Sequence, residues 1–510
     1  MGDKRRAETA TMDTPTKTMR SEKNFPVDNS TDVSVGQTLP SLSPAEDRRL
    51  TTKIDIKLIP ILGLLYLICF LDRTNIANAK IADLEAGLDM PQKGYNTALW
   101  IFYIPFVLAE VPSNMIMSLP WIKPNLWLGS QTFILGLLAM CQGLTHSYDG
   151  LLAIRFLMGI VETGLPAGAG LLIASYYRKK EVGLRFAIFL ACGEAGACFS
   201  GLLAYAIADL DGAGGYEGWR WYAFIAEALM ILLTDIFRIF IIEGLITIFF
   251  AIFVFIFTPN FPAADSWLKD SDKAALLNRL ENDRGEEKTT IEGSNWKKVF
   301  LDYKVWLVTG LFFCADTSAG SLSAFNPTIL SQLGWKSRRA QVMTIPVWVT
   351  GIVGALGSCL LSDRLNLRWP FIFLAQIVAI AGWAIHYAQV QPTGVRYFAQ
   401  FMISFGTFVS MPLYMGLLMT NLRGRVSIAF GSAVQFGFGN CANFVSSNIF
   451  ISTQAPRYPV GFGTGLGITA FSVPLMMLVI VLFRAHNKKV EAQEAAGERI
   501  DDQVDYKYVY

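Results

Sequence analysis

The sequence contains few charged residues for its length. Asp, Glu, Lys and Arg together make up only 16% of the 510 residues, whereas a typical soluble chain has about 25%. Hydrophobic residues make up 53%, and the mean hydropathy is +0.39. This composition argues against a soluble multidomain enzyme. The net charge of +2 indicates no particular partner, and no basic patch interleaved with aromatic residues predicts binding to nucleic acid.

Histidine and cysteine are scarce where metal sites and disulfides would need them. The chain has only three histidines, and these lack the spacing of metal ligands. All seven cysteines fall inside apolar runs, so we interpret them as small buried residues. The glycine-rich runs at 351–357 and 463–467 are also apolar, and glycine in such runs commonly lets helices pack closely. We therefore expect no metal ion, no cofactor and no nucleotide site.

Long apolar runs make up most of the chain. Each has roughly 18–25 residues, which is the length of helix that crosses a bilayer. The runs lie near 55–72, 95–117, 126–144, 151–174, 185–208 and 239–257, and then near 305–325, 342–361, 370–388, 396–419, 428–451 and 465–484. This layout predicts an all-α membrane protein with twelve transmembrane helices in two six-helix halves. Transporters with two such halves hold their substrate between them.

The polar segments divide the chain into domains. Residues 1–53 are rich in Ser, Thr and charge and have no apolar core, so we expect a disordered tail rather than a signal peptide. The N-terminal half spans 54–257 and the C-terminal half spans 305–484. The middle loop, 258–304, is expected to carry surface helix, and 485–510 form a second tail. Lys and Arg gather in the tails and the middle loop, which predicts that all three are cytoplasmic.

Charged residues inside two apolar runs are the strongest functional signal. Asp72 and Arg73 end the first run, and Arg155 and Glu162 lie within the fourth. A charge at bilayer depth costs about 2.5–3.5 kcal/mol on insertion scales, so it persists mainly where it faces a cavity. Seven residues are close to two helical turns, which puts Arg155 and Glu162 on one helix face about 10 Å apart. A cation and an acid on one face suit an anion whose passage is tied to a proton, which predicts a transporter.

A purely structural role could also account for these charges. Asp72 and Arg73 could simply reach water at a helix end, and Arg155 and Glu162 could form an ion pair that holds two helices together. We favour function, because a guanidinium presents a planar fork to a carboxylate. Burial also favours the protonated form of a glutamate, which suits Glu162 to proton transfer.

Other polar residues inside the apolar runs are weaker candidates. Tyr103 could reach the cavity as a hydroxyl donor, and Asn440 could contact the substrate, although amides between helices often serve packing. Glu110, Glu194 and Asp316 are isolated acids, and one acid in a helix defines no geometry. Of these, Asp316 could face the cavity, whereas Glu194 could equally form a local hydrogen bond.

Several motifs resemble those of one family. Residues 70–79 are similar to F-L-D-R-x-N-I-x-N-A, residues 155–164 to R-F-x-x-G-x-x-E-x-G, and residues 176–185 to Y-Y-x-x-x-E-x-x-x-R. This set resembles the fungal allantoate permease-like group in the anion:cation symporter family of the major facilitator superfamily, and it also resembles nicotinate permeases. The resemblance implies the major facilitator fold, a fungal plasma membrane, a protonation site at Asp72 and an anion contact at Arg73.

From the charges and the resemblance, we expect proton-coupled symport of a small organic carboxylate such as allantoate or nicotinate. The transporter is expected to be a monomer that works by alternating access. The expected substrate ligands are Arg73, Arg155, Tyr103 and Asn440, and the expected proton carriers are Asp72 and Glu162. A non-transporting nutrient sensor on the same fold is the alternative, but the short tails favour transport. An integral-membrane enzyme would need a His, Cys or Ser constellation that the sequence does not offer.

One segment departs from the family pattern. The chain from 222 to 257 is almost unbroken apolar sequence, which is too long for one span. The resemblance implies that W-R-W runs directly into I-F-I-x-E-G. Removing 222–238 joins residues 219–221 to residues 239–244 in that way and leaves a single span. We therefore predict that 222–238 is an insertion translated from an unspliced intron.

Overall fold

The computed structural model describes most of the chain. The described residues are 43–80, 84–117, 119, 121–209, 235–284, 295–335, 337–365, 367–422, 425–496 and 507–508. Most of the expected tail 1–53 lies outside them, but its last residues, from Pro44 onward, are helical rather than disordered. The suspected insertion 222–238 also lies outside them, except for 235–238 at the start of a helix. The insertion therefore stays a prediction.

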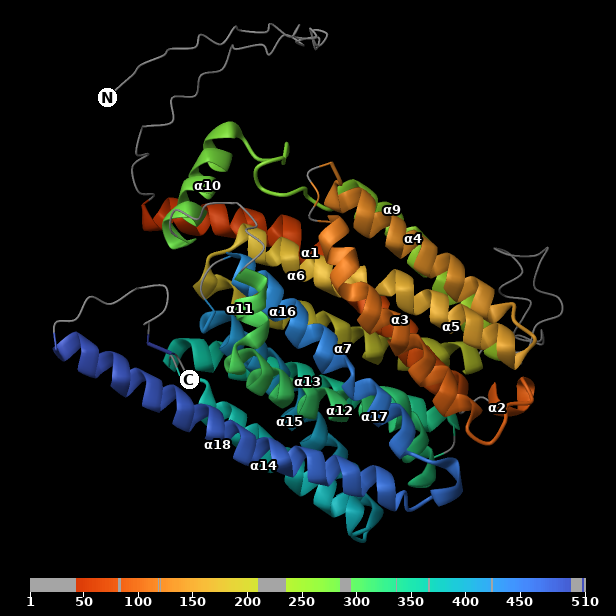
Figure 1. Cartoon of the computed structure of the whole chain (residues 1–510). Helices are drawn as coiled ribbons and strands as arrows, with labels where there is room; N and C mark the ends of the chain where they lie inside the picture. Colours follow the sequence, from red (N-terminus) through yellow and green to blue (C-terminus); the bar gives the residue numbers. More distant parts are fainter. Residues whose placement is uncertain are drawn as a thin grey trace, which may run out of the picture. The chain divides into compact units, whose positions relative to one another are not determined.

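All regular secondary structure in these residues is helical (Figure 1). The N-terminal half contains α1 (Pro44–Lys80), α2 (Leu84–Gly87), α3 (Gly94–Met117), α4 (Pro124–Gly143), α5 (Tyr148–Glu162), α6 (Gly164–Tyr176), α7 (Lys179–Asp209) and α9 (Asp235–Phe257). The connection carries α10 (Asp270–Arg284) and α11 (Asn295–Leu301). The C-terminal half contains α12 (Tyr303–Gln332), α13 (Ser337–Leu365), α14 (Trp369–Tyr387), α15 (Thr393–Thr420), α16 (Arg425–Asn440), α17 (Ala442–Ile449), the short 3-10 helix η2 (Ser452–Gln454) and α18 (Pro459–Ala495).

The helices form twelve spans, six in each half. Nine helical stretches in the described part of the chain are long and apolar enough to cross a membrane, and one of these joins α5 and α6. α3, α9 and the consecutive pair α16 and α17 supply the other three spans. Because an even number of spans returns the chain to its starting side, α1 begins and α18 ends at the same end of the bundle (Figure 1).

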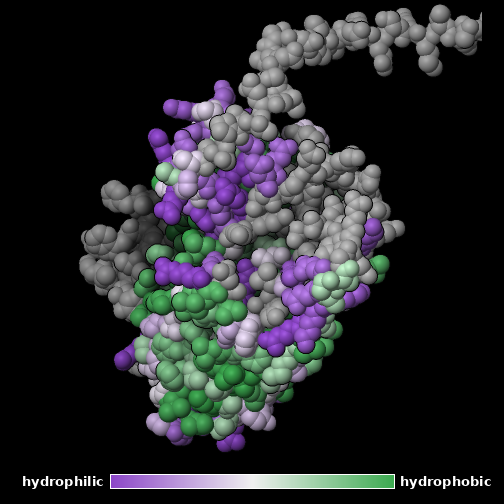
Figure 2. Space-filling view, turned by 90° about the vertical axis from the view of Figure 1, so that its left-hand side faces the viewer, coloured by the Kyte–Doolittle hydropathy of each residue, from purple (hydrophilic) through white to green (hydrophobic). Residues whose placement is uncertain are grey.

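Large apolar side chains cover the outside of the bundle. Leu108 of α3, Phe249 of α9, Val353 of α13 and Phe471 of α18 are all more than half exposed. Figure 2 shows a broad hydrophobic area below a group of hydrophilic residues on one face. An apolar surface of this kind is what a helical bundle presents to lipid, where all backbone groups are satisfied within the helices.

Small residues bring helix backbones together within the N-terminal half. A Cβ atom on Gly159 of α5 would lie 2.1 Å from the carbonyl oxygen of Phe102 in α3. A Cβ atom on Gly196 of α7 would lie 2.2 Å from the carbonyl oxygen of Leu67 in α1. Only glycine allows such close approach between spans. These contacts hold α5 close to α3 and α7 close to α1.

The two halves meet along several helices. α7 packs against α13, and α3 packs against α16 and α17. The hydroxyl of Tyr95 in α3 donates a hydrogen bond to the carbonyl oxygen of Ala324 in α12 at 2.9 Å. Asn96 of α3 donates to the carbonyl oxygen of Ser447 in α17 at 2.6 Å. Hydrogen bonds near the start of α3 thus join the halves at the end of the bundle opposite to the start of α1.

The two helices of the connection pack against different halves. α10 occupies the segment that we expected to be surface helix, and it buries Leu276 and Leu280. Its ion pairs, described below, run to α1 and α7. α11 packs against α16, where Phe300 and Phe438 place their ring centres 6.5 Å apart. The connection is therefore attached to the N-terminal half at its beginning and to the C-terminal half at its end.

Candidate functional site

A cavity lies between the two halves, lined by helices of both. Its empty volume is about 800 Å³ including the space open to solvent, and water-sized molecules can place their centres in about 60 Å³ of it. That is room for several water molecules. Polar side chains from both halves line it, namely Tyr66, Arg73, Tyr103, Glu110, Asp316, Ser323, Asn440, Asn443, Ser446 and Ser447. The rest of the wall is mainly aromatic and aliphatic, as in most small-molecule sites.

Among the described residues that line this cavity, only Arg73 of α1 is basic. Its Nε atom donates to Oε1 of Glu162 at 2.5 Å, and the side chain is 12% exposed. The guanidinium carbon lies 4.7 Å from the ring centre of Phe106 and 5.6 Å from that of Phe102, within the range of cation–π contacts. Its Nη2 atom has no hydrogen-bond partner within the described residues. This Nη2 atom is itself buried, so the residue meets the cavity with other atoms, while Glu162 holds Nε in place.

A break in the fourth span brings Glu162 to Arg73. α5 ends at Glu162 and α6 begins at Gly164, with Thr163 between them. The hydroxyl of Thr163 donates to the carbonyl oxygen of Phe106 in α3 at 2.6 Å. A Cβ atom on Gly164 would lie 2.2 Å from the Ser113 hydroxyl oxygen, so α6 starts in close contact with α3. Broken helices of this kind recur at transporter substrate sites.

Asp72 and Arg155 form a second charged group behind the cavity. Both are buried, with 3% of each residue exposed, and neither belongs to the cavity lining. They lie within electrostatic range of each other and of Glu243 in α9, which is 1% exposed. Both carboxyl oxygens of Asp72 lack hydrogen-bond partners in the part of the chain that the structure describes. The guanidinium of Arg155 therefore lies near the carboxyl groups of Asp72, Glu162 and Glu243, and Asp72 receives no direct hydrogen bond from it.

The wall formed by the C-terminal half carries an acid and two amides. Asn443 of α17 donates to Oδ2 of Asp316 in α12 at 2.8 Å. Asn440 donates to the carbonyl oxygen of Phe436, one turn earlier in α16, at 2.9 Å. The helix breaks at Cys441, so Asn440 and Asn443 lie on either side of the break. Asp316 is thus fixed in orientation opposite to the wall that carries Arg73.

The structure brings together some of the residues expected from the sequence and separates others. Arg73, Tyr103 and Asn440 line the cavity, and Glu162 contacts Arg73 from behind. Asp72 and Arg155 lie outside the lining, as described above. The sequence suggested that Asp316 could face the cavity, and it left Glu110 without a role; both residues line the cavity. The one signal for Glu110 was a lone acid in an apolar run.

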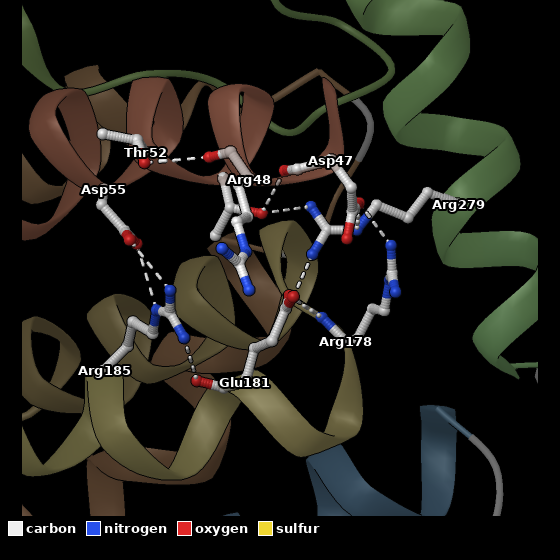
Figure 3. A network of polar contacts seen from close by, with 9 residues as sticks. Asp47, Arg48, Thr52, Asp55, Arg178, Glu181, Arg185 and Arg279 are labelled. Carbon is white, nitrogen blue, oxygen red and sulfur yellow. Dashed lines mark hydrogen bonds and ion pairs between the residues drawn. The ribbon is translucent and has the colours of Figure 1, made fainter. Parts of the chain in front are cut away.

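Ion pairs join α10 to the N-terminal half (Figure 3). Arg279 of α10 pairs with Asp47 of α1 at 3.0 Å and with Glu181 of α7, and it donates to the hydroxyl of Thr51 at 2.8 Å. Arg178, just before α7, pairs with the same Asp47 at 2.5 Å. This ion-pair network gives the Glu of the Y-Y-x-x-x-E-x-x-x-R motif a structural contact.

The Arg of the same motif also has a structural partner. Arg185 of α7 donates to both carboxyl oxygens of Asp55 in α1, at 3.1 Å from Nε and 2.8 Å from Nη2 (Figure 3). This two-pronged geometry is the strongest arrangement of an arginine and a carboxylate. In the described ranges, no group of three or more His, Cys, Asp or Glu residues is placed to hold a metal ion.

Known proteins share this architecture and sequence. A model of the Major Facilitator Superfamily matches residues 62–439. An uncharacterized transporter of Schizosaccharomyces pombe is 31% identical over 473 residues, which cover 92% of this chain and 90% of the relative. The high-affinity nicotinic acid transporter of Saccharomyces cerevisiae is 26% identical over 490 residues, which cover 92% of this chain and 86% of the relative.

A solved structure agrees in fold. The bacterial homologue of the human lysosomal transporter Spinster, crystallised in an inward-facing and occupied conformation, matches with a TM-score of 0.60. The match covers 87% of this chain and 98% of that one at 14% sequence identity, so the likeness concerns the fold alone. The expected superfamily and the expected all-α fold are both confirmed. With twelve spans in two halves around a shared polar cavity, the chain belongs to the major facilitator superfamily and is a multi-pass membrane transporter rather than an enzyme.

Proposed function

We propose that this protein is a proton-coupled symporter of a small organic carboxylate, of the kind represented by allantoate and nicotinate. The observation that carries the proposal is the position of Arg73, which is the one basic residue among the described residues of the cavity lining. A guanidinium edge binds a carboxylate through two parallel hydrogen bonds. The yeast relative is named for nicotinic acid, which is a small carboxylic acid. Tyr103 and Asn440 would complete the polar contacts to such a substrate.

Glu162 gives this site a means of coupling to protons. Its carboxylate and the carboxylate of a substrate would compete for the guanidinium of Arg73. Protonation of Glu162 on the outer side weakens its ion pair and makes Arg73 available to the substrate. Loss of that proton on the cytoplasmic side restores the ion pair and displaces the substrate. The substrate and the proton therefore move in the same direction in each cycle.

The charged group of Asp72, Arg155 and Glu243 would serve as a second proton store. Two carboxyl groups share one guanidinium, so one of them has no countercharge of its own. Such a group holds a proton more readily than a paired acid does. The expected role of Arg155 as a direct substrate ligand stays a prediction, because its side chain lies outside the cavity lining.

The proposed setting is a fungal plasma membrane, with a monomer whose two termini are cytoplasmic. The basic residues of the tails and of the middle loop support this orientation. The ion-pair network of Arg178, Arg185 and Arg279 lies at the end of the bundle where α1 begins, which would be the cytoplasmic end.

The proposal is tested by uptake of labelled carboxylates into cells at about pH 5 and about pH 7.5. We expect faster uptake at the lower pH, lost in the Arg73→Ala variant and no longer pH-dependent in the Glu162→Gln variant. Arg155→Ala is compared alongside. A parent protein that takes up none of the carboxylates at either pH, while it is present at the membrane, would overturn the proposal.

A further inference from the structure

The charges around the cavity do not match a substrate that carries negative charge alone. Asp316 and Glu110 line the cavity together with Arg73, and Glu162 lies directly behind Arg73. Among the described residues of the lining, acids therefore outnumber the arginine. A simple anion bound to Arg73 would face an unpaired carboxylate on the opposite wall. Burying an unpaired charge is costly, so this wall needs a positively polarised partner.

Allantoate and nicotinate both contain nitrogen besides their carboxylate, and we propose that Asp316 is the residue that accepts a hydrogen bond from such a nitrogen of the substrate. This nitrogen would be an ammonium, a protonated heterocycle or an amide N–H. The inference rests on the proposed function, because it places the carboxylate of the substrate on Arg73. It adds a second binding end, formed by the C-terminal half, and so defines the substrate as a bipolar molecule that spans both halves.

Asp316 is built to accept such a donor. The residue is 7% exposed and lies in the wall of the cavity. Asn443 donates to its Oδ2 at 2.8 Å, which fixes the carboxyl group in one orientation. Asn443 is itself confined, because a Cβ atom on Gly320 would lie 2.3 Å from its Oδ1 atom. In the described part of the chain, Asp316 has no ion pair within 4 Å, and Arg73 is its nearest charged influence across the cavity.

Glu110 does not offer an equivalent end. It lines the same cavity, but from α3, on the same half as Arg73. Its Oε2 atom lies against α16, because a Cβ atom on Gly437 would approach it to 3.2 Å. A substrate held by Arg73 and Asp316 bridges the two halves, whereas one held by Arg73 and Glu110 would not. Bridging lets substrate binding draw the halves together, which is the step that alternating access requires.

Two matched pairs of ligands test the inference by binding to the purified full chain. δ-Aminovalerate and hexanoate have the same length and differ only in a terminal ammonium or methyl group. Glutaric monoamide and δ-oxohexanoate differ only in a terminal amide NH₂ or methyl group. We expect the nitrogen-bearing member of at least one pair to bind about tenfold or more tightly than its partner, since a hydrogen bond to a charged group is among the stronger ones.

The same ratio is then measured in two variants that each turn one cavity acid into its amide. Asp316→Asn is expected to lower the ratio to near one, and Glu110→Gln is expected to leave it unchanged. A ratio within one variant does not depend on how much of the protein is folded. The inference is overturned if the parent shows no preference, if Asp316→Asn retains it, or if Glu110→Gln removes it equally. It is also overturned if Asp316 proves to bind sodium instead of the nitrogen of the ligand.

The outcomes separate this inference from the proposed function. If none of the four carboxylates binds to the parent, and Arg73→Ala changes nothing, the proposed carboxylate site itself is wrong. If all four bind and lose affinity in Arg73→Ala, but without any preference for nitrogen, the carboxylate site stands and only the assignment of Asp316 fails.

Discussion

Arg73 and Glu162 are joined by an ion pair between α1 and the broken end of α5, with 2.5 Å between Nε and Oε1. The side chain of the preceding residue, Asp72, forms no hydrogen bond in the described part of the chain and lies within electrostatic range of both Glu162 and Arg155. Successive residues of a helix point about 100° apart, so adjacent charges reach different neighbours. Arg73 of α1 therefore pairs with Glu162 of α5, and Asp72 of α1 lies near Arg155 of α5 without a direct hydrogen bond. One ion pair reaches the cavity, and the other group stays behind it.

Replacement by lysine is predicted to impair transport differently at Arg73 and at Arg155. Arg73→Lys keeps the charge but loses the planar fork, so the substrate concentration for half-maximal uptake should rise by about tenfold or more. Arg155→Lys should mainly lower the maximal rate and the amount of folded protein, because Asp72 and Glu243 depend on that guanidinium. Concentration-dependent uptake, normalised to membrane protein, distinguishes them. Equal effects on half-saturation would put both arginines in contact with the substrate.

The Glu162→Gln variant is predicted to uncouple transport from protons. An amide resembles the protonated acid and cannot lose a proton, so Arg73 stays available at every pH. Uptake by the parent should fall from about pH 5 to about pH 7.5, whereas the variant should exchange labelled for unlabelled substrate equally at both. It should no longer accumulate substrate against a gradient. Accumulation like that of the parent would remove Glu162 from the coupling mechanism.

Gly159→Ala is predicted to destabilise the N-terminal half. The added methyl group would lie 2.1 Å from the carbonyl oxygen of Phe102, and overpacking of this kind costs about 1–3 kcal/mol. The melting temperature in detergent should fall, and ligand affinity should fall with it, because Phe102 also packs over Arg73. Gly183→Ala is the control, since nothing lies within 4 Å of a Cβ atom there. Equal melting temperatures for the two variants would contradict the close approach of α3 and α5.

Arg279→Ala is predicted to release α10 from the N-terminal half. The Arg279 side chain is 3% exposed and pairs with Asp47 and Glu181, and removing one partner of a buried pair costs about 3–5 kcal/mol. Limited proteolysis should then cut within α10 at lower protease concentrations. Lys53→Ala is a matched control, because Lys53 also links α1 to α10, through Asp272, but its side chain is 40% exposed. A solvent-exposed pair is worth at most about 1 kcal/mol.

Deletion of 222–238 is predicted to preserve or improve expression and uptake. The segment separates two motifs that belong together, and without it the apolar stretch has the length of one span. Expression of the two forms side by side, with sequencing of the mature transcript, tests this. A transcript that keeps the codons, together with loss of uptake on deletion, would establish the segment as part of the protein.

The twelve spans could be predicted from the sequence because apolar runs of bilayer length rarely form anything other than membrane helices. Arg73 and Glu162 could be identified individually for a similar reason, since charges are rare at that depth. Their partnership could not, because Gly164 and Pro166 indicate a kink near Thr163 but do not reveal which neighbouring helix Glu162 then meets. The role of Asp316 in the cavity depends on the direction in which α12 faces, and one acid without a periodic pattern does not reveal that direction.

The way in which the connection is attached limits how far the halves of this transporter can separate. α10 ends at Arg284 and is fastened to the first half, and α11 begins at Asn295 and packs on the second. Only 285–294 run between the two attachments, and a fully extended chain of that length reaches about 35 Å. This short tether bounds the amplitude of any rocking motion, and a pair of spectroscopic labels placed on α10 and α11 would measure that motion directly.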